Sequence, residues 1–219
     1  MDIEELDTLK QLLIKGLTAL NIEPKDEILE KFILLLGELK KWNRAYNLTA
    51  ITKDKDVIIK HFLDSLLYLK FIPAGNWSIC DIGSGAGFPG LPIAFVRHDL
   101  NISLLEPSKK KSSFLKHIKR ILSMKNVEIM DSRIEDIKGL VFDIAVARAI
   151  FSVSELIEKT RNILKENGFL IMNKGPGLAD EIKDIPDDYK IEVLTVELPL
   201  TSIKRKIVKI QRFPTHLPC

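Results

Sequence analysis

The feature that most constrains the fold is a strand, a glycine-rich turn and a helix in direct succession over residues 77–97. The apolar run at 77–82 is short and has a glycine on each side, which predicts a buried strand. Glycines then alternate with small residues at Gly83, Gly85 and Gly87. Glycine permits positive φ and lets a ligand lie against bare backbone, and the free N–H groups at a helix start attract an electron-rich group. The turn therefore predicts a ligand site.

Two kinds of ligand compete for such a turn. A dinucleotide favours G-x-G-x-x-G, but the spacing here is G-x-G-x-G, and Phe88 occupies the place of the third glycine. Asp81, two residues before the first glycine, would repel a pyrophosphate and suits a ligand that carries a cation, such as the amino group of a methionine moiety. The alternative is an ordinary α/β turn that binds no ligand.

A second carboxylate supports a nucleoside ligand. The apolar run 101–105 predicts the next strand, and Glu106 follows it directly. A carboxylate at the tip of the second strand can accept hydrogen bonds from both ribose hydroxyls. After the third strand the candidates for an adenine contact are Asp131 and the backbone at Ile134 and Glu135. An arginine after the fourth strand, Arg148, is too costly to bury unpaired and is expected to line the cleft.

The stretch 81–94, DIGSGAGFPGLPIA, resembles motif I of the class I S-adenosylmethionine-dependent methyltransferases. Its fuller form, with FPG and LP after the glycines, is similar to the bacterial small-subunit ribosomal RNA guanine-N7 methyltransferases, also known as glucose-inhibited division protein B. Further stretches match that family in order: NLTAI at 47–51, HFLDSL at 61–66, LLEPSKKKSSFL at 104–115, SRIED at 132–136, ARA at 147–149 and MNKG at 172–175. The resemblance covers the chain from about residue 40 to about 175, and the order of the motifs makes it specific.

The resemblance implies S-adenosylmethionine as cofactor and methylation of nitrogen 7 of one guanosine in small-subunit (16S) ribosomal RNA or a ribosomal particle. It favours Ile134 and Glu135 over Asp131 for the adenine, although this chain has Ile where the family more often has Ala. The expected cofactor-binding residues are Asp81, Gly83, Gly85, Phe88, Glu106, Ile134, Glu135 and Arg148.

The alternation of strands and helices predicts an α/β fold with a seven-stranded, mostly parallel sheet and an antiparallel C-terminal hairpin. The resemblance implies the same architecture, the class I methyltransferase (Rossmann-like) fold. Residues 1–70 are expected to form an N-terminal helical extension packed on the core, and 71–219 the S-adenosylmethionine-binding domain. Strands are expected at 77–82, 101–106, 126–130, 142–147, 168–173, 189–197 and 203–212. Helices are expected at 57–69, 88–97, 109–123, 152–165 and 177–184, with a short one near 133–137.

Composition excludes several classes of protein. The chain is 46% hydrophobic and 29% charged, and its apolar runs are far below the ~18 residues of a membrane span. The acidic N-terminus lacks the features of a signal peptide, and Cys80 and Cys219 do not suggest a disulfide framework, so we expect a cytoplasmic protein. We also expect it to be a monomer. No C-x-x-C or histidine cluster suggests a metal.

Basic residues concentrate in two places although the net charge is only +3. Residues 108–125 hold seven Lys or Arg and no acid, and a second strip lies at 204–212. Such a helix is either a solvated face or a contact for RNA phosphates, with salt-dependent affinity. The candidates for RNA contact are Lys109, Lys110, Lys111 and Lys174.

A further group, His61, Asp64 and Ser65, shares one face of the helix expected at 57–69. His61 and Asp64 can act together in acid–base catalysis, or they can simply fix the helix to its neighbours. Methylation of guanine N7 needs no general base, because that nitrogen carries a lone pair and no proton, so no catalytic residue is assigned. The alternatives are a small-molecule methyltransferase, a nicotinamide-dependent dehydrogenase and a non-catalytic RNA-binding module.

Overall fold

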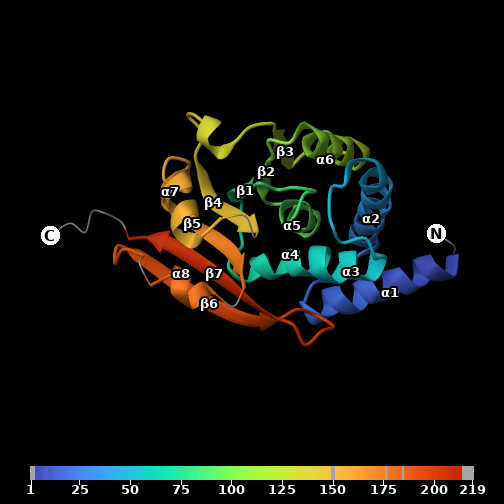
Figure 1. Cartoon of the computed structure of the whole chain (residues 1–219). Coiled ribbons are helices and arrows are strands. Elements are labelled where there is room, and N and C mark those ends of the chain that lie inside the picture. Colours follow the sequence, from blue (N-terminus) through green and yellow to red (C-terminus); the bar gives the residue numbers. More distant parts are fainter. Residues whose placement is uncertain (1–2, 149–150, 176, 184, 214–219) are drawn as a thin grey trace.

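The computed structural model describes residues 3–148, 151–175, 177–183 and 185–213, which include a seven-stranded sheet in the order β3-β2-β1-β4-β5-β7-β6 (Figure 1). The strands are β1 Ser78–Ile82, β2 Asn101–Leu105, β3 Val127–Met130, β4 Phe142–Arg148, β5 Leu164–Lys174, β6 Tyr189–Glu197 and β7 Lys204–Arg212. The first five pair in parallel, whereas β7 is antiparallel to both β5 and β6. The predicted sheet, with its antiparallel C-terminal hairpin, is confirmed.

Helices cover both faces of this sheet. Successive side chains of a strand point to opposite faces of the sheet, and each face has its own hydrophobic core. Ile79 of β1 belongs to the larger core and Cys80 to the smaller one. The helices of the larger core are α1 Ile3–Ala19, α2 Asp26–Tyr46, α5 Gly90–Val96 and α6 Lys109–Ile121. The other face carries the 3₁₀ turn η3 Ile134–Asp136, α7 Val153–Thr160 and α8 Leu178–Glu181. Because both faces are covered, the central strands read as continuous apolar runs.

The N-terminal helices share the larger core with the sheet. Leu13 and Leu17 of α1 are fully buried in this core, which also contains Ile79 and Ile144 of the strands. A Cβ at Gly16 would lie 2.3 Å from Leu63 Cδ1, so α1 packs very closely on the segment that follows α2. The proposed boundary between an extension at 1–70 and a domain at 71–219 stays a prediction.

The segment that follows α2 was expected to be one helix over 57–69, but it begins earlier and is not uniform. Its parts are α3 Asp54–Val57, the π-helical turn η1 Ile58–Leu63, α4 Asp64–Leu66 and the 3₁₀ turn η2 Leu67–Lys70. The wider π turn includes His61 and directly precedes Asp64, the two residues singled out from the sequence.

Two later helices are shorter than expected. The helix expected over 152–165 ends at Thr160, because Phe142 of β4 donates its N–H to the Ile163 carbonyl at 2.7 Å and draws the chain into the sheet. The chain then enters β5 at Leu164. Similarly, α8 occupies only part of the expected 177–184.

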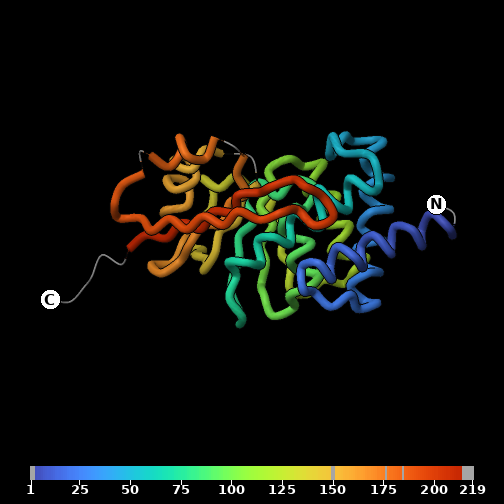
Figure 2. Tube along the Cα trace, turned by 90° about the horizontal axis from the view of Figure 1, so that it is seen from below, coloured from blue at the N-terminus to red at the C-terminus, as the bar shows by residue number. Residues whose placement is uncertain are grey.

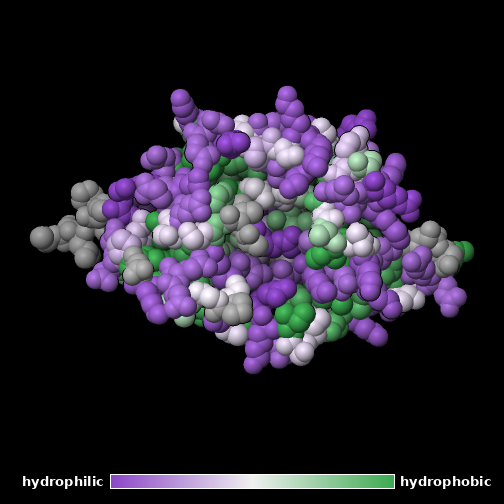
Figure 3. Space-filling view, in the orientation of Figure 1, coloured by the Kyte–Doolittle hydropathy of each residue, from purple (hydrophilic) through white to green (hydrophobic). Residues whose placement is uncertain are grey.

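The β6–β7 hairpin extends beneath α4 toward α1 (Figures 1 and 2). Leu198, just beyond β6, is fully buried in the core that α1 and α2 share with the sheet. Hydrophilic side chains cover most of the face that Figure 3 presents. No described helix is long and apolar enough to cross a lipid bilayer.

Candidate functional site

The parallel strands bring the predicted residues to one edge of the sheet. The glycine turn follows β1, Glu106 follows β2, Arg148 ends β4 and Asn173 lies near the end of β5. Ligands of open α/β sheets bind beyond these carboxyl ends. In spatial order the edge therefore presents Glu106, the glycine turn, Arg148 and Asn173.

The glycine turn has the backbone that its composition predicts. Gly83, Gly85 and Gly87 all have positive φ, at 64°, 61° and 95°. A Cβ at Gly85 would meet nothing closer than a backbone oxygen 3.9 Å away, so this position is open on one side. A Cβ at Gly87 would instead lie 2.3 Å from Leu91 Cδ1, so Gly87 serves packing. The open side at Gly85 is the place where a ligand can lie against backbone.

Asp81 is completely buried beneath this turn. Its Oδ2 accepts a hydrogen bond from Gly90 N–H at 2.7 Å, an approach that a side chain at Gly90 would obstruct, since its Cβ would lie 2.8 Å from Oδ2. Asp81 Oδ1 has no partner; among the described residues the other buried side-chain oxygen without one is Ser84 Oγ. Burial raises the pKa of Asp81 to about 7. A buried, unpartnered carboxylate oxygen of this kind suits a cationic group.

Glu106 is held against the same turn. Its Oε2 accepts from Gly85 N–H at 2.8 Å and its Oε1 from Ser108 N–H at 2.8 Å, and the residue is only 5% exposed. Each carboxylate oxygen has a second lone pair, so both can still accept from a ligand. The structure thus brings Glu106 and the glycine turn together, as the sequence predicts.

The residues after β3 make a different contribution. Ile134 is buried in the smaller core, whereas the exposed Glu135 pairs with Lys159 of α7. Asp131, the other candidate for the adenine, is held by Ser112 and Lys116 of α6, and the hydrogen bonds from both lower its pKa. The side chains of Asp131 and Glu135 are therefore both engaged with helices.

Arg148 joins the glycine turn to the π turn. Its guanidinium lies 5.3 Å from the centre of the Phe88 ring and its Nη2 lies 2.9 Å from His61 Nδ1. The His61 ring stacks on Phe88, with ring centres 4.5 Å apart. Arginine can only donate, so Nδ1 accepts and Nε2–H donates to Thr49 Oγ1 at 2.8 Å. Burial, followed by the charge of Arg148, lowers the pKa of His61 to about 3, so this histidine is neutral near pH 7.

Asp64 is a third buried carboxylate at this edge, and its side chain is 5% exposed. It accepts from Arg205 Nε at 2.8 Å and from Asn173 Nδ2 at 3.2 and 3.3 Å, and Arg148 Nη1 lies 3.8 Å away. One carboxylate thus links α4, the end of β5 and β7. The role of Arg205 was not predicted; the only signal was its place in the basic strip 204–212.

Tyr68 is another residue that sequence reasoning missed. Its hydroxyl donates to the Ala147 carbonyl at 2.7 Å and accepts from Asn173 N–H at 3.1 Å, so it fixes the ends of β4 and β5 from beneath. The expected ARA motif continues at 149, which lies outside the described residues. No pattern in the sequence distinguishes Tyr68 from an ordinary core aromatic.

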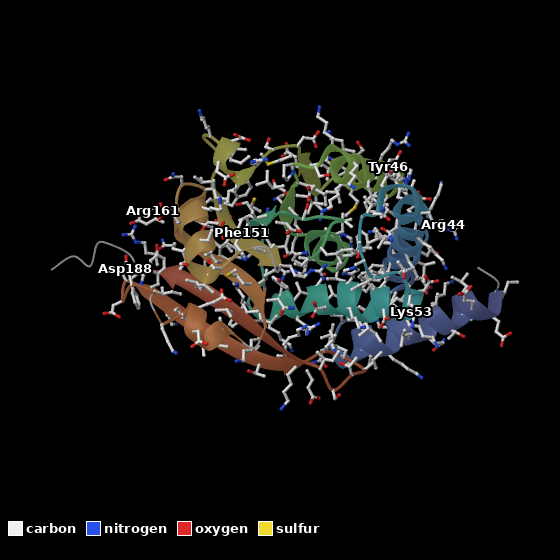
Figure 4. All side chains as sticks on the ribbon, viewed as in Figure 1. Arg44, Tyr46, Lys53, Phe151, Arg161 and Asp188 are labelled. Carbon is white, nitrogen blue, oxygen red and sulfur yellow. The ribbon has the colours of Figure 1, made fainter. Side chains whose placement is uncertain are left out.

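The lysines predicted to contact RNA differ in their surroundings. Lys110, in the first turn of α6, donates to the Tyr46 carbonyl at the end of α2, where Figure 4 labels Tyr46. Lys174 is largely buried; its ammonium donates to the Phe151 carbonyl at 2.5 Å and pairs with Glu181 at 2.7 Å. Lys174 thus has internal partners, and its contact with RNA stays a prediction. Within the described part of the chain, no cluster of three potential metal ligands is found.

Comparison with known proteins decides the family. The model of the GidB family, described as rRNA small subunit methyltransferase G, matches residues 28–208. The chain belongs to this family. Proteins named ribosomal RNA small subunit methyltransferase G are among its GidB-family relatives: that of Acetivibrio thermocellus is 34% identical over 100% of this chain and 95% of its own length, and that of Clostridium botulinum (strain Alaska E43 / Type E3) is 36% identical over 92% and 89%. The family expected from the motifs is confirmed.

Solved structures support the fold of this GidB-family chain. Coclaurine N-methyltransferase bound to N-methylheliamine and SAH has a TM-score of 0.56 at 16% identity, covering 87% of this chain and 73% of that one. Pyrococcus horikoshii TYW2 in complex with MeSAdo has a TM-score of 0.55 at 16% identity, over 71% and 63%. At this identity the likeness concerns the fold, and it places the sheet among methyltransferase folds.

Proposed function

We propose that this chain transfers a methyl group from S-adenosylmethionine to nitrogen 7 of a guanosine in small-subunit ribosomal RNA. Membership of the GidB family supports a methyltransferase that acts on small-subunit rRNA. The observation that supports this cofactor is Asp81 Oδ1, a buried carboxylate oxygen without a partner beneath an open glycine turn. That oxygen suits the ammonium group of the cofactor's methionine moiety.

The residues around the turn divide between the parts of the cofactor. Asp81 would hold the ammonium group, and the backbone of Gly83 and Gly85 would lie along the methionine chain. Glu106, fixed by two backbone N–H groups, would accept the ribose hydroxyls. The backbone at Ile134 and Glu135 remains the proposed contact for the adenine.

Phe88 and Arg148 complete the proposed cofactor site on its other side. The Arg148 guanidinium lies over the Phe88 ring. Arg148 ends β4, which pairs with β1 on the side opposite to β2, whereas Glu106 follows β2. Family membership removes the dehydrogenase from the alternatives. It also favours an enzyme over a mere binding module.

The chemistry makes modest demands on the protein. S-adenosylmethionine supplies an electrophilic methyl group on a sulfonium. The acceptor nitrogen has an exposed lone pair and no proton, so alignment of the two reactants accounts for most of the catalysis. His61 is neutral, but both of its ring nitrogens are engaged, by Arg148 and Thr49, so it holds its neighbours and takes no proton. This arrangement fits a reaction without a general base.

Methyl transfer from radiolabelled S-adenosylmethionine tests the proposal. The substrates are small ribosomal subunits, free small-subunit rRNA and a metabolite pool, and the modified base is then mapped. We expect label at N7 of one guanosine. Label in the metabolite pool alone would support the small-molecule alternative and overturn the RNA substrate. The monomeric state and the cytoplasmic location stay predictions, measurable by sedimentation and fractionation.

A further inference from the structure

A cationic cleft of about 750 Å³ lies next to Phe88 of the predicted cofactor turn, because its lining residues His61 and Arg148 both contact the Phe88 ring. One wall comes from the π turn and α4, the floor from the ends of β4 and β5, and the other wall from the β6–β7 hairpin. Six basic side chains line it: Lys60, Arg148, Lys174, Lys204, Arg205 and Lys206. Among the lining residues that the structure describes, the one acidic residue is Asp64. Such an excess of cations favours an anionic ligand.

The charges in this cleft are not equally available. Lys60 pairs with Asp56 and Lys174 with Glu181, while Arg205 and Arg148 share Asp64. Lys204 and Lys206 of the hairpin have no ion pair or side-chain hydrogen bond among the described residues. These two lysines therefore supply the cleft's uncommitted positive charge.

The walls of the cleft are fixed to each other by Asp64. The carboxylate binds Arg205 on the hairpin and Asn173 on the floor, and Arg148 lies beside it. Because His61 is neutral near pH 7, its protonation does not alter the cleft's charge in that range. The hairpin is thus held in a set position relative to the strand ends.

The sheet order gives the cleft its relation to the cofactor. Under the function proposed above, Asp81 and Glu106 commit the β1 and β2 ends of the edge to the cofactor. The acceptor must then reach the methyl group from the β4 and β5 ends, which is where the cleft lies, with Arg148 and His61 at the boundary. Residues 109–111 of α6 follow β2, at the opposite end of this arrangement.

We propose that this cleft receives the RNA segment that carries the acceptor nucleotide, with Lys204 and Lys206 contacting its phosphates and Asp64 positioning the hairpin that presents them. The inference rests on the proposed function. Phosphate contacts of this kind position a nucleic acid and supply salt-dependent affinity without reading its sequence.

Paired variants test the cleft. K204Q/K206Q removes its two uncommitted charges, and K190Q/K209Q removes two charges from the same hairpin at positions that do not line it. Binding of naked small-subunit rRNA, measured over a range of salt with S-adenosylhomocysteine present, gives the slope of log K against log salt. We expect the K204Q/K206Q slope to be shallower by roughly 0.7–0.9 for each lysine–phosphate pair removed, the K190Q/K209Q slope to change much less, and neither to alter affinity for S-adenosylhomocysteine.

The outcomes separate the two proposals. If the wild-type enzyme methylates the RNA but both double variants show the same salt slope, the RNA role of the cleft is overturned and the proposed function stands. A wild-type enzyme that methylates no small-subunit RNA would overturn the proposed function. If K204Q/K206Q binds naked RNA normally but loses activity on assembled subunits, the cleft contacts a ribosomal protein and the RNA assignment is wrong. A rise in KM for RNA with little change in kcat would support it.

Discussion

The buried carboxylate of Asp81 predicts that cofactor affinity depends on pH. Burial raises the pKa of this group from 3.8 to about 7, so ionising it in the free protein costs about 4 kcal/mol more than ionising the same carboxyl in water. A bound ammonium group favours the ionised form. At the proposed cofactor site, binding below pH 7 would therefore displace a proton from Asp81, and we expect the apparent affinity to fall as the pH falls.

The magnitude follows from a single titration near pH 7. Between pH 8 and pH 6 the ionised fraction of Asp81 drops from about nine-tenths to about one-tenth, so affinity should fall about tenfold, or about 1.4 kcal/mol. Isothermal titration calorimetry with S-adenosylhomocysteine measures this, since that ligand carries the same ammonium group. Repeating the titration at pH 6 in two buffers of different ionisation enthalpy counts the protons released, and we expect about one.

The Asp81→Asn variant supplies the control. It should bind more weakly at pH 8 and show little dependence on pH. A flat profile for the folded wild-type protein would refute the reasoning, as would an Asn variant that keeps the wild-type slope. The raised pKa also has a consequence for the free protein: this group's contribution to stability is present below about pH 4 and is lost as the pH rises through about 7.

Four further variants test other parts of the site. Gly85→Val should reduce affinity for S-adenosylmethionine at least ~10-fold, because it places a branched side chain at a φ of 61° on the open side of the turn; near-normal calorimetric affinity in a folded variant would contradict the site. Glu106→Gln should weaken S-adenosylmethionine and S-adenosylhomocysteine alike, and a response from only one would disprove the ribose contact. Alanine at all of 109–111 should flatten the salt dependence of RNA binding by up to roughly 0.7–0.9 log units for each phosphate interaction removed, whereas an unchanged slope would remove α6 from the RNA site. Asp64→Asn should lower the free energy of unfolding in urea by roughly 3 kcal/mol, because it leaves two half-buried arginines without their carboxylate partner; a loss below about 1 kcal/mol would show that the carboxylate does not hold the cleft together.

The parts of the fold that could be read from the sequence are those with local causes. The strand ends at 82 and 105 and the glycine turn follow from apolar runs and from φ values that favour glycine. Asp81 and Glu106 were predicted to lie at the cofactor edge because each follows from its place relative to a strand end. The early end of α7 depends on a hydrogen bond to Phe142 of β4, a partner that no local pattern identifies.

The parts that could not be read depend on contacts between distant residues. Asp64 meets Arg205 across 141 positions of the chain, and Tyr68 meets Ala147 and Asn173 across 79 and 105. The sequence placed His61 and Asp64 on one helix face but left their roles open. The structure shows that their partners come from β4, β5 and β7, which explains why spacing along the helix was insufficient.

The seam between α2 and α6 contains a natural optical probe. Trp42 lies 5.4 Å from Tyr46, 5.6 Å from Phe114 and 5.3 Å from His117, measured between ring centres. The chain has one other tryptophan, Trp77, which belongs to neither helix. Its indole N–H donates to the Ala74 carbonyl. A Trp77→Phe protein would therefore carry a single tryptophan. Its emission maximum and quenching would report in real time whether α6 shifts against α2 when RNA binds.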